Sequence, residues 1–303
     1  MSRQRSNLTA MKFALLPLLC ASALIGTPAA LYAQSGAESR PPVVLPNTEV
    51  RLLDASSNGV QYKLYVSLPP GYRTDGARYP VMYLLDADYS FAIARNITEH
   101  LTERNHLPPV VLVAIAYGGP PAYRLNRTRD YTPTHVPDGG YGPEYQRVSG
   151  GAPAFLGFIR DELIPFVARE YHVSDDRAIV GHSYGGLFVS WAMMQEPTLF
   201  GRVIAVSPSL WYDDHLLMGM EEAFAQRVRA LPVHLYAGVG IREVNSERNM
   251  VTDLQQFTGQ LRTHGYEGLE LQMHVLENET HNSVFPIVLT KGLRWVYRDL
   301  GAR

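Results

Sequence analysis

The stretch RAIVGHSYGGLF, residues 177–188, joins a short apolar run to a serine framed by glycines. Gly181 and Gly185 flank Ser183 at two positions' distance, which matches the pattern G-x-S-x-G. The motif alone is weak evidence, because glycine and serine are common. Its setting is stronger, since AIV is typical of a buried strand and LFVSWAMM, residues 187–194, of a helix. A strand, a tight turn and a helix present a serine as a nucleophile at the carboxyl end of a sheet; the alternative is a structural turn serine.

The remaining hydrophobic pattern predicts a three-layer α/β fold. Alternating segments at 48–54 and 60–68 indicate an antiparallel pair of strands at the start. Later apolar runs are nearly continuous, which is typical of strands buried on both faces of a parallel sheet. Together with one alternating segment near the end, they lie at 79–88, 109–117, 177–183, 202–209, 233–238 and 269–276. Helical segments between them favour a mostly parallel eight-stranded sheet with helices on both faces.

The N-terminal 33 residues have the composition of a secretory signal peptide. MSRQRSNLTAMK is basic and contains no acid, FALLPLLCASALIG is too short to span a bilayer comfortably, and Ala33 is a small residue before a cut. An uncleaved anchor is the alternative. Lipidation of Cys20 is disfavoured by the bulky Leu19. We therefore expect a domain of residues 34–303, exported to the periplasm, with no stable membrane insertion after cleavage.

Charge and cysteine content exclude several kinds of function. Cleavage removes the only cysteine, which excludes thiol nucleophiles, thiolate metal sites and disulfides. It also removes three basic residues and no acid, so the net charge falls from −2 to −5, which disfavours nucleic-acid binding. Asp86 and Asp88 are the one suggestive acidic pair, but nothing else at ligand spacing accompanies them. We expect neither a metal nor a cofactor.

One long segment, 118–151, has no apolar period and is rich in Gly, Pro, Tyr and Arg. A loop of this length inside a compact domain is usually functional or disordered. Its aromatic and arginine residues favour an ordered loop that contacts a ligand, and a solvated insertion is the alternative.

A nucleophilic serine needs a base, and in this strand order the base follows the last strand. His281 lies in that loop, whereas His274 and His234 lie within strands and His182 is fixed in the turn. An orienting acid should follow the preceding strand. Glu243 is nearest to that strand end; Glu247 and Asp253 come later, and a dyad without an acid remains open.

Stabilisation of the oxyanion requires two backbone N–H donors. One is the N–H of Tyr184, directly after the nucleophile. The other belongs to the loop YLLDADYSF, residues 83–91, where we place it at Asp88, with Ala87 as its neighbour and alternative.

Six motifs in order resemble the esterase-D-like branch of the α/β-hydrolases: YLLDADYSF, RTRDYTPT, FIRDELIPF, GHSYGGLF, SPSLWY and ETHNSVFP. Within that branch they are most similar to enzymes that hydrolyse trilactone siderophores of the enterobactin, salmochelin and bacillibactin type. The resemblance implies an α/β-hydrolase fold, with Ser183 and His281 as nucleophile and base and the oxyanion position at Asp88. Some relatives work as a dyad, so the resemblance leaves the acid open. It also implies that Ser209 and Trp211 line the rim of the pocket, with a buried core tryptophan as the alternative.

The expected function is thus that of an exported serine esterase acting on a small-molecule ester, in particular a catecholate trilactone siderophore such as ferric enterobactin, to release iron. Two alternatives are a general carboxylesterase or acyltransferase with the same triad, and a non-catalytic binding protein. Because the mature chain is negative, an anionic substrate needs local arginines rather than long-range steering. We expect Arg95 and Arg124 to bind substrate, and Arg127 and Arg129 of the same loop are further candidates. The alternative for Arg129 is a pair with Asp130 or another acid that holds the loop.

Overall fold

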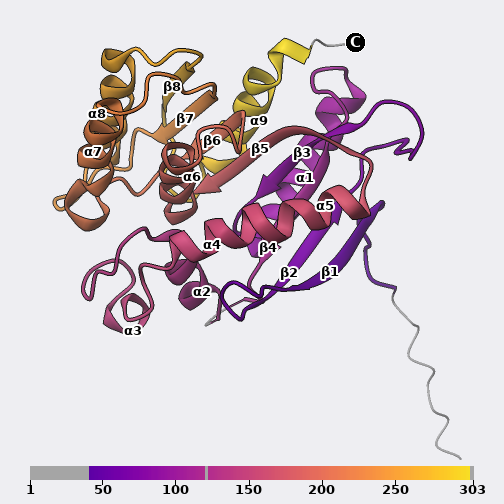
Figure 1. The fold of residues 1–303 in the computed structure, drawn as a ribbon, viewed down its shortest axis with the longest axis horizontal. Helices are drawn as coiled ribbons and strands as arrows, with labels where there is room; N and C mark the ends of the chain where they lie inside the picture. The colour runs from indigo at the N-terminus through magenta and orange to yellow at the C-terminus, as the bar shows by residue number, and fades with distance from the viewer. Residues whose placement is uncertain (1–40, 120–121, 301–303) are drawn as a thin grey trace, which may run out of the picture. The chain divides into compact units, whose positions relative to one another are not determined.

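An eight-stranded sheet organises residues 41–119 and 122–300, the part of the chain that the computed structural model describes (Figure 1). The strand order is β1-β2-β4-β3-β5-β6-β7-β8, with β2 antiparallel to both neighbours and all other pairs parallel. Residues from Val44 onward form one compact unit, to which the following description refers. The strands are β1 (Thr48–Asp54), β2 (Gln61–Ser67), β3 (Tyr79–Leu84), β4 (Val111–Ala116), β5 (Val173–His182), β6 (Arg202–Val206), β7 (His234–Gly240) and β8 (Glu270–Leu276).

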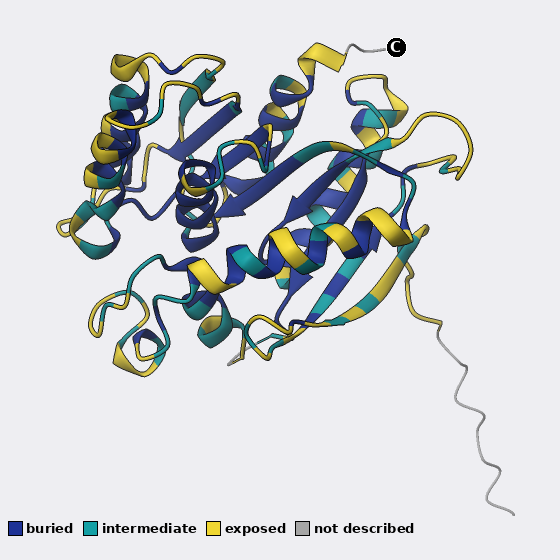
Figure 2. Cartoon of the chain, viewed as in Figure 1, coloured by how far each residue is buried: buried dark blue, intermediate teal, exposed yellow. Residues whose placement is uncertain are grey.

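Helices cover both faces of the sheet. On one face lie α1 (Ala87–Glu103) and α9 (Phe285–Val296), whose apolar side chains form one core cluster with alternate strand residues. The other face is covered by a second cluster. Its helices are α4 (Ala152–Phe158), a π-helical turn (Ile159–Leu163), α5 (Ile164–Glu170), α6 (Tyr184–Gln195), α7 (Tyr212–Ala225) and α8 (Met250–His264). In Figure 2 the central strands are buried, whereas α4 and α5 alternate between buried and exposed residues.

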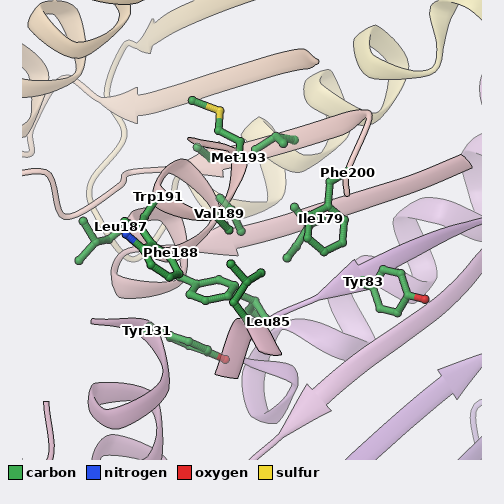
Figure 3. Close-up of a cluster of buried hydrophobic side chains, with 14 of the residues drawn as sticks. Tyr83, Leu85, Tyr131, Ile179, Leu187, Phe188, Val189, Trp191, Met193 and Phe200 are labelled. Atoms are coloured by element: carbon green, nitrogen blue, oxygen red, sulfur yellow. The ribbon is translucent and has the colours of Figure 1, made fainter. Parts of the chain in front are cut away.

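The two core clusters explain the continuous apolar runs of the sequence. In β3, Val81 and Tyr83 face one cluster while Met82 and Leu84 face the other, and none of the four is more than 1% exposed. Figure 3 shows part of the second cluster, including Tyr83, Ile179 and Phe200. Strands buried on both faces have no polar side to alternate with. The predicted α/β-hydrolase fold is therefore confirmed.

Helix α6, which begins directly after Ser183, is buried along nearly its whole length. Every residue from Tyr184 to Met194 is buried, because the helix packs against β5 and β6 on one side and against α2 (Ala122–Tyr131) and α7 on the other. Phe188 of this helix packs against Tyr131 of α2, with ring centroids 6.0 Å apart (Figure 3). The strand–turn–helix unit at Ser183 is thus held by packing on all sides.

Segment 118–151 is not the continuous loop that the sequence predicts. It contains α2 and the short helix α3 (Pro143–Gln146). The buried side chains of α2 are Arg127, Thr128, Asp130 and Tyr131, which are mostly polar. A helix that buries polar and aromatic groups has no hydrophobic period, so pattern reasoning overlooks it. We call residues 118–151 the cap segment below.

The predicted signal peptide lies outside the described residues. Within the described ranges, no helix combines the length and apolarity needed to cross a membrane.

Candidate active site

Ser183 occupies a strained turn at the carboxyl end of β5. Its backbone angles are φ 61° and ψ −117°, in a region that residues with a Cβ rarely adopt. Two main-chain hydrogen bonds hold the turn: Ser183 N–H donates to Val206 O at 2.9 Å, and Ser209 N–H donates to Ser183 O at 3.1 Å. Since α6 begins at the next residue, the serine side chain stands at the helix N-terminus.

Two glycines make this turn possible through close backbone contacts. A Cβ on Gly181 would lie 2.1 Å from Gly185 O, and a Cβ on Gly186 would lie 2.8 Å from Val206 O. Any larger residue at either position would push α6 away from β5 or β6. Gly181 of the motif therefore has the close-approach role that the sequence suggests, whereas a Cβ on Gly185 would lie 3.2 Å from its nearest neighbour, Asp86 Oδ2.

His281 and Glu243 form a hydrogen-bonded pair beside the serine. His281 lies in the loop between β8 and α9, and its Nδ1 is 2.6 Å from Glu243 Oε2. The side chain of Glu243 is 1% exposed. Its other oxygen, Oε1, accepts hydrogen bonds from Ser207 Oγ at 2.6 Å and from Gly240 N–H at 2.7 Å. The carboxylate is thus fixed at both oxygens, which is the environment that orients an imidazole.

The structure brings Ser183, His281 and Glu243 to one pocket. Among the described residues no hydrogen bond joins Ser183 Oγ to the His281 ring, and the polar partner of Ser183 Oγ is Ser209 Oγ at 3.4 Å. Catalytic hydrogen bonds are often long before substrate binds. The alternative acids do not contact this histidine: Asp253 lies 3.2 Å from His215, and Glu247 is exposed.

The segment after β3 supplies candidate oxyanion donors. Asp86 has a left-handed backbone (φ 58°), and its N–H donates to Tyr131 Oη at 3.1 Å. Helix α1 begins at Ala87, so the N–H groups of Ala87 and Asp88 lie in its first turn, where helices leave donors unpaired. The Asp88 carboxylate accepts from the N–H groups of Tyr117 and Gly118, at 2.7 Å each, and so secures the loop after β4. The roles of Asp88 and Tyr184 at the oxyanion stay predictions.

Asp86 is held by a buried ion pair. Arg127, 1% exposed, binds both carboxylate oxygens of Asp86, at 2.9 and 3.0 Å. The same guanidinium donates to His182 O at 3.3 Å and to Tyr141 Oη. The cap segment therefore contacts the backbone of the turn that carries Ser183, through Arg127. In the described ranges no group of three His, Cys, Asp or Glu side chains is arranged to hold a metal ion.

The catalytic candidates open into a pocket of ≈ 520 Å³. Trp211 lies on its wall, where the resemblance places it. Its lining residues are Gly140, Tyr141, Ser183, Tyr184, Ser209, Trp211, Arg242, Glu243, Val244, Asn245, Arg248, Met250, Thr280, His281 and Asn282. A groove of ≈ 510 Å³ between α9 and β8 contains none of the predicted site residues.

Two arginines in this pocket, Arg242 and Arg248, were missed in the sequence. The Arg248 guanidinium lies over the Trp211 ring, 3.6 Å from its centroid. Among the described residues, neither arginine forms a salt bridge. Both arginines are visible in the loop VGIREVNSERN, residues 239–249, one directly before the acid candidate Glu243 and one five residues after it.

The prediction for Arg95 is wrong in its location. Arg95 is 6% exposed, pairs with Glu99 in the next turn of α1, and donates to Pro46 O at 3.1 Å, outside the pocket of Ser183. Arg124 does lie near the rim: it is exposed, and its guanidinium is 5.7 Å from the ring centroid of Tyr141, a pocket residue. Arg127 is buried in its pair with Asp86, and Arg129 pairs with Asp130 at 2.6 Å, which is the alternative stated for it.

The fold and the site together define a serine hydrolase of the α/β-hydrolase type. The chain belongs to the family described as "Putative esterase", whose model matches residues 55–293. It is 30% identical over 270 residues to the ferri-bacillibactin esterase BesA of Bacillus subtilis, covering 85% of this chain and 92% of that one. It is also 33% identical over 194 residues to the siderophore triacetylfusarinine C esterase of Aspergillus fumigatus, covering 61% and 63%.

Solved structures agree with this assignment. An IroE-like serine hydrolase from Shewanella oneidensis matches with a TM-score of 0.76 and 27% identity, covering 84% of this chain and 81% of that one. The siderophore hydrolase EstB from Aspergillus nidulans matches with a TM-score of 0.72 and 26% identity, covering 86% and 98%. The protein is a carboxylic-ester hydrolase.

Proposed function

We propose that this enzyme hydrolyses the ester bonds of a catecholate trilactone siderophore, such as enterobactin in its ferric form, and so releases iron. The observation that carries the proposal is the joint presence, in one pocket, of the Ser183, His281 and Glu243 group and a wall of Trp211, Arg242 and Arg248. The relatives named as siderophore esterases support the same substrate class.

The geometry supports an acyl-enzyme mechanism. Ser183 Oγ attacks the ester carbonyl while His281 accepts the hydroxyl proton, and Glu243 holds the protonated ring through Nδ1. The N–H groups of Tyr184 and Asp88 stabilise the oxyanion. His281 then gives its proton to the departing alkoxide. Water, deprotonated by the same histidine, releases the acid and restores the serine.

The pocket wall suits an anionic aromatic substrate. A guanidinium over the face of an indole still has N–H groups that can pair with phenolate oxygens, and both groups can pack on catechol rings. Arg248 on Trp211 has this arrangement, and Arg242 is exposed at the same mouth. Because the predicted mature chain is negative, these local contacts carry the affinity.

Replacing Arg248 or Arg242 by alanine is expected to raise KM for the ferric trilactone by about 10- to 100-fold, as loss of one or two charge-assisted contacts predicts. KM for p-nitrophenyl acetate should change less than about twofold, since a neutral short ester makes no such contact. Initial rates on both substrates measure the difference. Arg262→Ala, on the exposed face of α8, is the matched control.

Equal effects on the two substrates would contradict the role of these arginines. If the wild-type enzyme hydrolyses p-nitrophenyl esters but no trilactone, the siderophore proposal is wrong, and the alternative of a general carboxylesterase or acyltransferase takes its place.

The proposal extends to export, on the strength of the basic and apolar composition of residues 1–33. N-terminal sequencing of protein recovered from the periplasm should begin at or near Gln34. Recovery of chains that retain FALLPLLC would contradict it.

A further inference from the structure

The residue before the nucleophile, His182, has a side chain that the mechanism above does not use. It is 8% exposed and packs against three separate parts of the chain. Its ring centroid lies 4.5 Å from that of His281, with 35° between the planes. It lies 6.0 Å from the ring of Phe285 at the start of α9. On the side of α1, Tyr89 Oη is 2.7 Å from His182 Nδ1.

Only one of the two ring nitrogens of His182 has a side-chain hydrogen-bond partner among the described residues. Tyr89 satisfies Nδ1, but Nε2 is buried and has no hydrogen-bond partner among the described residues. Among the described residues, no hydrogen bond joins the His182 ring to the side chain of His281. The two rings instead pack against each other at a tilt of 35°.

The surroundings of His182 keep its ring uncharged. Burial lowers its pKa well below the usual range, and the neighbouring His281 and the Arg127 guanidinium lower it further. The groups that face it are Tyr89 from α1, Arg127 from α2 and His281 from the β8–α9 loop; Phe285 from α9 carries no charge. A second imidazolium at this distance would oppose the positive charge that His281 must acquire during hydrolysis.

The hydrogen bond to Glu243 alone does not fix the base. It constrains His281 at Nδ1, and the side chain of His281 remains 36% exposed. A ring attached through one hydrogen bond still swings about that contact, which moves Nε2 relative to Ser183. The His182 ring, packed against the imidazole at 35°, limits this movement. Because His182 is adjacent to Ser183 in the chain, it ties the ring of the base to the nucleophile's own turn.

We infer that His182 is a positioning residue for His281: its ring packs on the imidazole and directs Nε2 toward Ser183. The inference rests on the proposed role of His281 as the base. It assigns His182 no proton transfer and no contact with substrate.

The test compares variants that keep or remove the ring face. His182→Leu and His182→Gln remove it, and kcat for p-nitrophenyl acetate should fall about 10- to 100-fold, in line with the cost of displacing a catalytic group by about 1 Å. KM should stay within about twofold, because binding contacts are untouched. His182→Phe keeps an uncharged ring and should retain kcat within about threefold. His100→Leu, an exposed histidine at the far end of α1, is the control.

A spectroscopic measurement separates positioning from loss of stability. The proton shared by His281 Nδ1 and Glu243 should give a downfield NMR resonance in the wild type and in His182→Phe. In His182→Leu and His182→Gln it should broaden or move upfield, since the ring becomes mobile. If the leucine variant does not fold, the glutamine and phenylalanine variants still provide the comparison.

Two results would overturn the inference. One is wild-type kcat in folded His182→Leu or His182→Gln. The other is a loss of kcat in His182→Phe as large as that in His182→Leu and His182→Gln. It would show that activity depends on a ring nitrogen of His182 and not on the packing of its ring. Failure of the base assignment looks different, because His281→Ala would then retain activity whatever His182 does.

Discussion

Replacing Ser183 by alanine is expected to abolish ester hydrolysis and leave the fold unchanged. The loss in kcat should be about 10⁵- to 10⁶-fold, because only binding and oxyanion stabilisation remain once the nucleophile is absent. The Ser183 side chain contributes little to the stability of the fold, since the polar partner of its Oγ is Ser209 Oγ at a long 3.4 Å. The strained backbone at φ 61° is imposed by the neighbouring strands and helix and is the same for alanine.

Rates on p-nitrophenyl acetate, with thermal unfolding measured in parallel, provide the test. A fluorophosphonate probe should label the wild type at Ser183 and leave the alanine variant unlabelled. Ser246→Ala, in the exposed β7–α8 loop, should match the wild type in both assays. Near-normal turnover by folded Ser183→Ala would exclude the mechanism.

Removal of the base is expected to be nearly as damaging. His281→Ala should reduce kcat almost as far as Ser183→Ala, because serine and histidine act as one unit. Glu243→Gln should cost less, about 10- to 10⁴-fold, since the acid orients and stabilises the imidazolium without transferring a proton. The double variant Ser183→Ala/His281→Ala should be no worse than either single variant.

The assignment of Glu243 as the orienting acid can be contradicted separately from the roles of Ser183 and His281. A silent Glu243→Gln, together with a strong loss in Glu247→Gln or Asp253→Asn, would reassign it. The structure argues against that outcome, because Glu243 is the carboxylate that contacts His281 at 2.6 Å. If none of the three substitutions reduces kcat, the enzyme works as a dyad.

The sheet and the catalytic candidates were predictable because each depends on local pattern and chain order. Continuous apolar runs identify strands buried on both faces, and the order of nucleophile, acid and base along such strands leads to Glu243 and His281. The burial of the segment that carries Arg127 was not predictable in the same way. Its helix buries charges that pair with a residue 41 positions earlier, and no periodicity records such a pair.

The substrate-binding arginines show a different limit. Arg95 was assigned by its nearness in sequence to Asp88, but seven residues of helix carry it about 10 Å along the axis, to the pair with Glu99. Arg242 and Arg248 reach the pocket because the loop after β7 folds over against Trp211. That meeting depends on how loops from different strands converge, which one sequence does not specify.

The buried pair of Arg127 and Asp86 bears on how this enzyme could change its substrate. The cap segment resembles an exchangeable insertion, yet it provides the counter-ion for a carboxylate next to the catalytic serine. Swapping in a foreign cap that lacks this arginine leaves Asp86 buried and unpaired, at a cost of about 3–5 kcal/mol. New specificities are therefore more accessible through residues 241–249, where every side chain except Glu243 and Arg248 is exposed. Substitutions there alter the mouth of the pocket and spare the scaffold.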